Sequence, residues 1–573
     1  MLANGVERMA LTASLQGNRI VLSNTALRDR EDCKAIFGSS YKDGRWTIPV
    51  NWLAVKQLRA LLPSAKIDES LITWCWQEYQ DRILPTLAQR ADALDPYYEE
   101  TEGGPLYPYQ KTGSRFLSFA GGAILADDMG TGKTATAIAA VEIRNAYPCL
   151  VVCPNSAKWN WQREWQKWGH GSSVQVISGT ATQRRKQIAS SADVYVINYE
   201  SLRTHTKLAG YGSLRLSDTD KLHKELNDIQ WKAVLADEAH RTVDPNAKQT
   251  RALWGVSQDA SLRIAITGTP MVNTPDDLWS LLHFVAPDEW PGKTKYIDRY
   301  CIQGYSPFGG LVIAGLNPHN QQEFYDLLEP RFIRRTKAMV LPWLPPKVYE
   351  RRDVEMLPKQ RKAYDEFDNL SYANLDGGIS LAIDPLTELI RKVQLASASA
   401  ELVNGELRLC APSNKVEELI NLLNDMESSE PLVVFALRRQ LLVLAAERLD
   451  KEGISYVTVW GNQSSWERQT AIDRFQGGGE VRVILCTLGA GSEAITLTAA
   501  STVCFLQRSW SMVTNRQAED RVHRPGQSAS QVTYIDFVAP GTVDEDILVA
   551  IEAKEDLFQQ IVQDQAAIER LLA

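Results

Sequence analysis

The sequence has little of what marks secreted, membrane-spanning or strongly basic proteins. Its eight cysteines are scattered with no C-x-x-C pair, which argues against zinc and favours a reducing compartment. No apolar run approaches the roughly 20 residues of a membrane-spanning helix. No basic start followed by an apolar segment is present, so no secretory signal is expected. A net charge of −8 argues mildly against nucleic-acid binding by bulk attraction, yet it permits a local basic groove.

What is present is an ordinary globular composition, with 44% hydrophobic and 23% charged residues. A chain of 573 residues exceeds what one hydrophobic core supports, so several structural units are expected. The predicted parts are a small accessory N-terminal domain over 1–100, a first lobe over 101–290, a helical insertion over 291–412, a second lobe over 413–545 and a C-terminal helix over 546–573.

Short apolar runs alternate with helical patterns in both predicted lobes. Strands are predicted at 124–126, 149–153, 174–177, 194–198, 234–236 and 264–267, and again at 432–435, 456–459, 481–486, 503–506 and 532–537. This alternation predicts an α/β fold with two tandem parallel-sheet lobes, a helical insertion and a small α+β N-terminal domain. Ligands in such folds bind beyond the carboxyl ends of the strands, where the notable polar residues of this chain cluster.

Residues 130–134 read Gly-Thr-Gly-Lys-Thr between an apolar run and a helix-forming run. This is the context of a phosphate-binding loop, in which backbone N–H groups surround phosphate oxygens. Lys133 would reach the β- and γ-phosphates, and the Thr134 hydroxyl would bind Mg²⁺. The strict pattern asks for glycine where this chain has Asp127. The alternative is a strand-to-helix turn that uses glycine only for tightness.

Two further clusters turn phosphate binding into a hydrolysis hypothesis. Asp237 and Glu238 end a predicted strand; Asp237 would hold Mg²⁺ and Glu238 would polarise the attacking water. Arg521 and Arg524 lie three residues apart and would point at the γ-phosphate from the second lobe if the segment is helical. The alternatives are a solvated turn for the acidic pair and a surface helix for the arginines.

The order of these motifs resembles a known family. The phosphate loop, Asp-Glu-Ala-His at 237–240, Thr-Gly-Thr-Pro at 267–270 and Gln-Ala-Glu-Asp-Arg-Val-His-Arg-Pro-Gly-Gln at 517–527 resemble a SWI/SNF-related superfamily 2 DEAH-box helicase-like ATPase. Segments 332–337 and 344–347 match the group-specific stretch between the lobes, and Asp520 is more similar to the annealing-helicase branch. The resemblance implies two RecA-like lobes, ATP and Mg²⁺ as cofactors, and duplex or branched DNA as partner.

The resemblance also implies the site residues. For catalysis these are Lys133, Asp237, Glu238, Gln517, Arg521 and Arg524, and for Mg²⁺ they are Thr134 and Asp237. For ATP binding they are Tyr107, Gln110, Asp128, Met129, Gly130, Thr131, Gly132, Lys133 and Thr134. For DNA contact they are Lys158, Asn198, Tyr199, Thr267, Arg438, Thr487, Gly489 and Trp510. Arg508 departs from the group, which usually has Asp there.

The leading hypothesis is a DNA-dependent ATPase that moves along duplex DNA, hydrolyses ATP at the interface of its lobes, and remodels or anneals DNA structures in repair. The alternatives are a strand-separating or branch-migrating helicase and a nucleotide-gated DNA-binding scaffold with weak ATPase activity. We expect a monomer without membrane contact, in the cytoplasm of a bacterial or phage-infected cell or in a eukaryotic nucleus. A protein partner would bind the N-terminal domain or the C-terminal helix.

Overall fold

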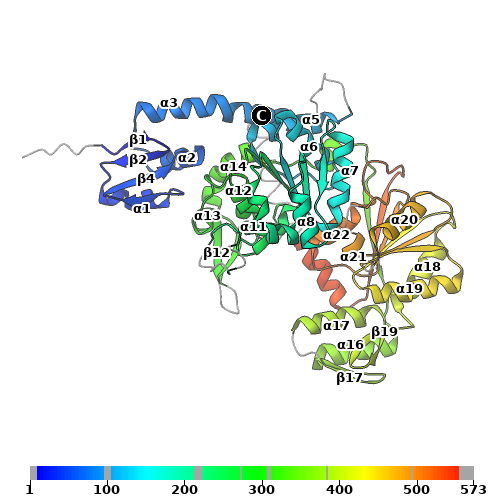
Figure 1. Cartoon of the computed structure of the whole chain (residues 1–573). Helices are drawn as coiled ribbons and strands as arrows, with labels where there is room; N and C mark the ends of the chain where they lie inside the picture. The colour runs from blue at the N-terminus through cyan, green and yellow to red at the C-terminus, as the bar shows by residue number, and fades with distance from the viewer. Residues whose placement is uncertain are drawn as a thin grey trace, which may run out of the picture. The chain divides into compact units, whose positions relative to one another are not determined.

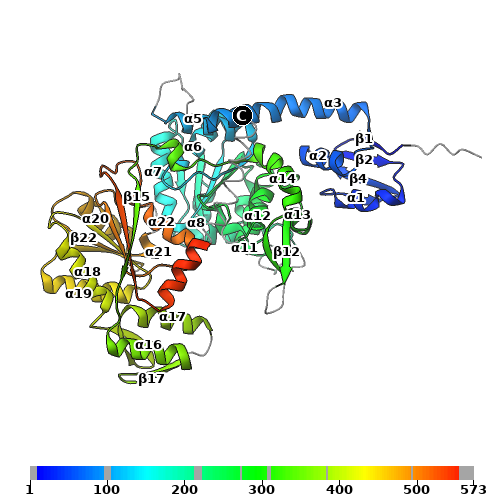
Figure 2. The same ribbon diagram turned by 180° about the vertical axis from the view of Figure 1, so that it is seen from behind.

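The computed structural model describes residues 10–95, 105–211, 218, 222–271, 274–305, 311–381, 385–461, 463–491 and 495–553. They form two compact units: the first runs up to Val340 without Met129–Thr131, and the second comprises Met129–Thr131 and the chain from Leu341 onward. Figure 1 labels many of their elements, and Figure 2 shows the chain from behind. Within the described ranges, no helix is long and apolar enough to cross a membrane.

The first unit begins with a small five-stranded sheet of order β3-β4-β2-β1-β5. Its strands are β1 Thr12–Gln16, β2 Arg19–Ser23, β3 Ser40–Lys42, β4 Arg45–Pro49 and β5 Lys66–Ile67, and its helices include α1 Arg30–Ala35, α2 Trp52–Leu61, α3 Glu69–Glu78 and α4 Leu84–Leu94. Ile20, Ile48 and Leu58 are completely buried between sheet and helix. The Gln57 side chain, on α2, donates to the Tyr300 hydroxyl at 3.3 Å, which fixes this sheet to the rest of the unit.

The main sheet of the first unit is parallel, in the order β14-β6-β11-β10-β7-β9-β8. The strands are β6 Gly122–Leu125, β7 Cys149–Cys153, β8 Val174–Val176, β9 Val194–Asn198, β10 Ala233–Asp237, β11 Leu262–Ile266 and β14 Phe332–Ile333. Helices flank the sheet (Figure 1): α5 Pro108–Ala120, α6 Lys133–Arg144, α7 Lys158–Trp168, α8 Ala181–Ile188, α9 Tyr199–His205, α11 Lys248–Val256 and α12 Asp277–Val285. Because helices cover the sheet, β7 and β9 are buried throughout, as their apolar sequences require.

Strand register places three loops at one edge of this sheet. Leu125 pairs with Ile266, and Ile266 pairs with Asp237, so β6, β11 and β10 end level with one another. Parallel strands present their carboxyl ends on the same side, which is where ligands bind in such sheets. The phosphate loop, the acidic pair and Thr267 therefore leave the sheet side by side.

The second unit holds a parallel sheet of order β15-β24-β23-β20-β22-β21. Its strands are β15 Lys347–Asp353, β20 Leu432–Ala436, β21 Tyr456–Val459, β22 Val483–Thr487, β23 Thr502–Phe505 and β24 Val532–Val538. Its helices include α18 Asn414–Asp425, α19 Arg439–Glu452, α20 Ser465–Gln476, α21 Leu488–Gly491 and α22 Met512–Glu519 (Figure 2). All eleven predicted strands exist within two residues of their predicted ends, so the predicted α/β fold class with two parallel-sheet lobes is confirmed.

The stretch 291–412, predicted to be helical, also contains strands. Its helices are α13 Lys293–Tyr300, α14 Gln321–Leu328, α15 Lys337–Val340, α16 Pro358–Leu370 and α17 Pro385–Ser397. Between them lie the hairpins β12 Cys301–Tyr305 with β13 Leu311–Leu316, β16 Tyr372–Leu375 with β17 Gly378–Leu381, and β18 Ser399–Val403 with β19 Glu406–Cys410. The Asn404-Gly405 turn, with φ values of 52° and 79°, is a hairpin signal visible in the sequence. Of the predicted C-terminal helix, residues up to 553 are helical and 554–573 lie outside the described residues.

Candidate ATP site

The phosphate loop joins β6 to α6, which begins at Lys133. Gly130 and Gly132 have φ values of 81° and 79°, in the left-handed region that glycine adopts without steric cost. The Lys133 ammonium turns back on the loop and donates to the carbonyl oxygens of Asp127 and Asp128 at 2.9 and 3.0 Å. Burial lowers the pKa of Lys133, and the carboxylate of Glu238 opposes that shift. Lys133 therefore lies within electrostatic reach of the acidic pair.

Gln110, the predicted adenine-contacting residue, packs against the loop. Its side chain is buried, and its amide oxygen accepts from the Tyr107 backbone N–H at 3.0 Å. A Cβ atom added to Gly132 would lie 2.3 Å from the Gln110 Nε2 atom. The segment before α5 and the phosphate loop are therefore in contact, as a site for one nucleotide requires.

We expect Gly132→Ala to weaken ATP binding at least about tenfold, because both the positive φ and the collision with Gln110 oppose it. The matched control is Gly171→Ala, since Gly171 has a φ of 86° but nothing within 4 Å of its added Cβ. Both variants should lose similar stability to backbone strain. Titration with a fluorescent ATP analogue measures affinity, and wild-type affinity in Gly132→Ala would contradict the packing described here.

The acidic pair sits at the end of β10. Asp237 Oδ2 accepts from the Trp161 indole N–H at 2.8 Å, Oδ1 accepts from the Glu238 backbone N–H at 3.0 Å, and the Tyr199 hydroxyl donates to the Asp237 carbonyl at 2.8 Å. Burial, helped by the neighbouring Glu238 charge, raises the pKa of Asp237 to about 6. Because burial disfavours the charged form of this carboxylate, a bound cation would stabilise that form strongly.

Glu238 has φ and ψ values of 50° and 48°, a conformation that is uncommon for a residue other than glycine and that concentrates at functional sites. The His240 Nδ1 atom lies 3.3 Å from Glu238 Oε2 and 3.1 Å from the Thr267 hydroxyl. Burial lowers the pKa of His240 to about 4, so the ring is neutral at pH 7. His240 thus joins the Glu238 carboxylate to the loop after β11 without adding charge.

Asp237 and His240 are expected to give the free energy of unfolding opposite pH dependences. The raised pKa of Asp237 means that stability is lost as the pH rises from about 4 to about 6. The lowered pKa of His240 means that stability is lost as the pH falls from about 6.5 to about 4. Each contribution is about 3 kcal/mol, so the two largely cancel in the wild-type chain.

Replacing either residue should expose the pH dependence of stability that the other residue causes. Relative to wild type, His240→Gln should lose stability with rising pH between about pH 4.5 and 6.5, and Asp237→Asn should gain it over the same range. Urea unfolding without nucleotide or Mg²⁺ measures both. The same direction of change in both variants would contradict the assignment of opposite shifts.

Asp127, which stands where the strict pattern has glycine, is a buried ion-pair partner. Its side chain is 1% exposed and Arg335 is 0% exposed. The Arg335 guanidinium donates to both Asp127 oxygens, with a Nη2–Oδ2 distance of 2.5 Å, and the Arg335 backbone N–H donates to Oδ1 at 2.9 Å. A carboxylate with this many charge-assisted bonds fixes the start of the loop, which explains the departure from glycine.

In the second unit, Arg521 and Arg524 lie in the turn after α22, which ends at Glu519, so the expected helix does not reach them. Arg524 donates to the Ile495 carbonyl at 3.1 Å and the Thr496 hydroxyl at 2.7 Å. Burial and the neighbouring Arg521 charge lower the pKa of Arg524 to about 9. Two cations held close together form a site that favours an anion.

Comparison with known proteins decides the family. The SNF2-related domain matches residues 67–402, more than half of the chain, and the helicase conserved C-terminal domain matches residues 414–526. The chain belongs to the SNF2-related family. The resemblance to SWI/SNF-related ATPases predicted from the motifs is thereby confirmed.

The chain spans only half or less of the length of two curated relatives. The human DNA annealing helicase and endonuclease ZRANB3 is 28% identical over 466 residues, 80% of this chain and 40% of the relative. The putative ATP-dependent helicase/translocase YwqA of Bacillus subtilis is 29% identical over 487 residues, 82% of this chain and 50% of the relative. The solved Sulfolobus solfataricus SWI2/SNF2 ATPase core in complex with dsDNA is 25% identical and covers 80% of this chain and 93% of that chain with a TM-score of 0.38.

Four of the residues expected to contact DNA lie in the first unit of this SNF2-related chain. Lys158, Asn198, Tyr199 and Thr267 are buried. The Lys158 ammonium donates to the Ile177 carbonyl at 3.2 Å, and burial lowers its pKa. The Tyr199 hydroxyl donates to the Asp237 carbonyl, and the Thr267 hydroxyl contacts His240, so both residues pack beside the acidic pair.

The candidates of the second unit are more accessible. Thr487 ends β22 and is half-buried, Gly489 is exposed, and Arg438 and Trp510 are half-buried. Residues 492–494 of the segment expected to couple DNA to ATP lie outside the described residues.

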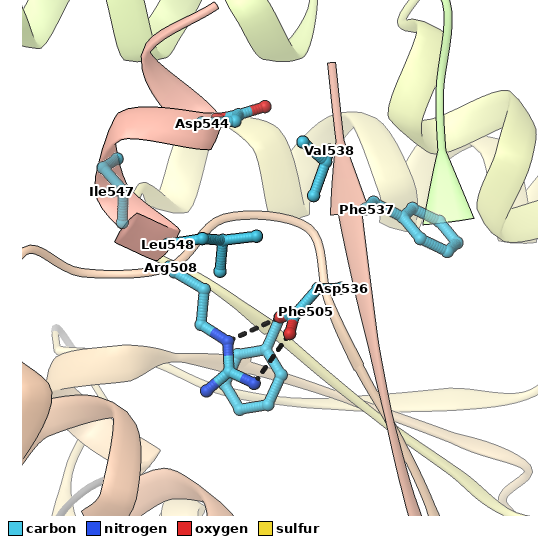
Figure 3. A pocket seen from close by; sticks show the side chains of 8 residues that line it. All are labelled: Phe505, Arg508, Asp536, Phe537, Val538, Asp544, Ile547 and Leu548. Carbon is cyan, nitrogen blue, oxygen red and sulfur yellow. Dashed lines mark hydrogen bonds and ion pairs between the residues drawn. The ribbon is translucent and has the colours of Figure 1, made fainter. Parts of the chain in front are cut away.

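Arg508, which replaces the usual Asp, lines a small pocket in the second unit (Figure 3). Its guanidinium lies 3.5 Å from the Phe505 ring centroid and donates to Asp536 at 2.5 and 3.1 Å. It also donates to Glu519 at 2.6 Å, and this bond stabilises the end of α22. The sequence pointed to a departure at Arg508, but Asp536 and Glu519 as its partners were not predicted.

Proposed function

We propose that this SNF2-related chain is an ATP-hydrolysing motor that acts on duplex or branched DNA. The observation that carries the proposal is the common edge of the first sheet, where the phosphate loop, Asp237 and Glu238 leave neighbouring strands. A phosphate-binding lysine, a metal-binding carboxylate and a base at one edge are the parts that hydrolysis of a nucleoside triphosphate requires. A site that bound a nucleotide without hydrolysing it would not need the acidic pair.

The residues fit Mg²⁺ in the way that such enzymes hold it. Among the described residues, no group of three or more His, Cys, Asp or Glu side chains could hold a metal. Mg²⁺ in phosphoryl-transfer sites is bound by one or two protein oxygens together with substrate phosphates and water. Asp237 and the Thr134 hydroxyl supply hard oxygen ligands of this kind. The metal would neutralise charge on the β- and γ-phosphates.

The chain's own groups would then act in defined roles. Lys133 would leave the Asp127 and Asp128 carbonyls and donate to phosphate oxygens, and Gln110 would contact the adenine. Glu238, held in place through His240, would orient the attacking water and take its proton. Arg521, with Arg524 near it in the turn after α22, would supply positive charge from the second unit as the phosphoryl group is transferred. Gln517, within α22, is proposed as a further catalytic residue.

The DNA part of the proposal is supported by the family and by the accessible candidates of the second unit. The relative ZRANB3 is named a DNA annealing helicase and endonuclease. We propose that Arg438, Thr487, Gly489 and Trp510 contact the DNA backbone, where contacts position a protein without reading sequence. A role in DNA repair and a monomeric state belong to the same proposal.

A side-by-side comparison of DNA substrates tests the proposal against its rivals. ATP hydrolysis should be stimulated by linear duplex, and displacement of a third strand from a triplex should report movement without strand separation. Strand release from a forked duplex with no triplex displacement would favour a separating helicase. DNA binding that depends on ATP without turnover would favour the scaffold.

A further inference from the structure

One continuous segment reaches both sets of catalytic candidates. We call residues 332–353 the strap; it runs from β14 through α15 to β15. At its start, Phe332 and Ile333 pair in parallel with Ile124 and Leu125, directly before the phosphate loop. At its end, β15 pairs in parallel with β24 over all seven of its residues. Each end is therefore an edge strand of a different sheet.

The first end of the strap makes further hydrogen bonds to the phosphate loop besides the Arg335–Asp127 pair. Arg334 donates to the Ala126 carbonyl at 2.7 Å and to Asp128 Oδ1 at 2.8 Å. The Lys337 backbone N–H donates to Asp128 Oδ2 at 3.0 Å, and the Asp128 backbone N–H donates to the Arg335 carbonyl at 3.0 Å. Both carboxylates that precede the loop are thus bound by the strap.

Arg335 also reaches the segment that is expected to contact adenine. Its guanidinium donates to the Tyr109 carbonyl and lies 5.3 Å from the Tyr109 ring centroid. A Cβ atom on Gly113 would come within 2.6 Å of the Arg335 Nη2 atom, so the first half of α5 is closely packed on the guanidinium. One buried side chain joins the phosphate-binding and base-binding parts of the first unit.

The second end holds the turn that carries Arg521. The Lys347 ammonium lies 3.3 Å from Glu519 Oε2 and 3.2 Å from Asp520 Oδ1. The Tyr349 hydroxyl donates to Glu519 at 2.8 Å, and His523 Nε2 lies 2.8 Å from the Pro345 carbonyl oxygen. The strap therefore contacts residues on both sides of Arg521, at 519–520 and at 523.

We propose that the strap is a positioning element for ATP hydrolysis, in which Arg335 sets the phosphate loop and Lys347 sets the turn of Arg521. This inference rests on the proposed function. Neither residue touches the nucleotide in this account; each acts through the residues that do. Because the loop binds ATP in the ground state whereas the arginine acts on transition-state charge, the two ends should give different kinetic signatures.

For the Lys347 end, Lys347→Met removes the charge and keeps the aliphatic stem. We expect kcat for ATP hydrolysis to fall about tenfold to a hundredfold while affinity for a fluorescent ATP analogue stays within about threefold. Lys347→Arg should restore most of kcat. The control is Lys359→Met, which removes an exposed pair with Asp376 and should leave kcat unchanged.

For the Arg335 end, Arg335→Lys keeps the charge but loses the planar two-pronged contact with Asp127. ATP affinity should weaken about tenfold or more, with kcat at saturating ATP within about threefold. The control is Arg331→Lys. Arg331 makes a two-pronged pair with Glu289 in the same unit, with both side chains 9% exposed, but does not touch the loop. It should lose comparable thermal stability and keep wild-type ATP affinity.

The proposal is overturned if Lys347→Met keeps wild-type kcat, if Lys347→Arg fails to restore it, or if Arg331→Lys and Arg335→Lys weaken ATP binding equally. Absence of ATP turnover in the wild-type chain would instead refute the proposed function. In that case, amide hydrogen exchange in the two variants still tests whether the strap positions the loop and the turn. Faster exchange confined to 519–524 in Lys347→Met and to 127–134 in Arg335→Lys supports it, and unchanged exchange at those places overturns it.

Discussion

Glu238→Gln should lower the rate of ATP hydrolysis by about a hundredfold to ten-thousandfold, because the amide cannot take the proton of the attacking water. ATP affinity should remain close to wild type. The substitution preserves size, and the side chain lies at the end of a sheet whose core it does not enter. Phosphate release measured in the presence of duplex DNA gives the rate, and titration with a fluorescent ATP analogue gives the affinity.

A comparison with Lys133→Ala separates catalysis from binding. Lys133 is expected to contact the phosphates in the ground state as well as in the transition state, so its removal should weaken ATP binding and turnover together. Glu238→Gln should affect turnover alone. Equal loss of affinity in the two variants, or wild-type turnover in Glu238→Gln, would contradict the role of Glu238 as the base.

Arg521→Ala should lower ATP turnover by about a thousandfold or more, which is the effect expected when an arginine that stabilises transition-state charge is removed. The neighbouring Arg524 is not expected to compensate, since its guanidinium is bound to the Ile495 carbonyl and the Thr496 hydroxyl. ATP affinity should change less than turnover. Steady-state kinetics with saturating ATP and duplex DNA checks both quantities.

The control for this variant is Arg474→Ala, which removes an exposed arginine from α20 of the same unit. It should leave turnover unchanged, and both variants should keep the thermal unfolding midpoint of the wild type within a few degrees. Full activity in Arg521→Ala would show that Arg521 does not stabilise the transition state, and Arg524 would then be the candidate for that role.

The parts of the fold that the sequence predicted are those governed by local pattern. The strand at 149–153 and the strand at 194–198 are continuous apolar runs, and both were predicted with the observed bounds. Lys133 and the acidic pair were predicted because glycine spacing and adjacent carboxylates are local signals. Their placement at one sheet edge follows from parallel pairing, which the alternation of strands and helices already implied.

What the sequence did not reveal depends on contacts between distant residues. Asp127 looked like a departure from a glycine pattern, and only the fold shows Arg335, 208 positions away, as its partner. Lys158 and Thr267 carry polar groups of the kind that bind DNA, yet side-chain burial is set by neighbouring helices and strands that a motif does not specify. The strands of the hairpins between 291 and 412 are too short to show periodicity, so only a turn signal such as Asn404-Gly405 marks them in the sequence.

The central claim is that the site of the first unit hydrolyses ATP in response to DNA. The most direct test is the rate of phosphate release from ATP and Mg²⁺ by the wild-type chain, with and without duplex DNA, beside Glu238→Gln. The account predicts slow release without DNA, at least about tenfold stimulation by duplex, and no stimulated release from Glu238→Gln. Turnover that is absent, indifferent to DNA, or unchanged in Glu238→Gln would contradict it.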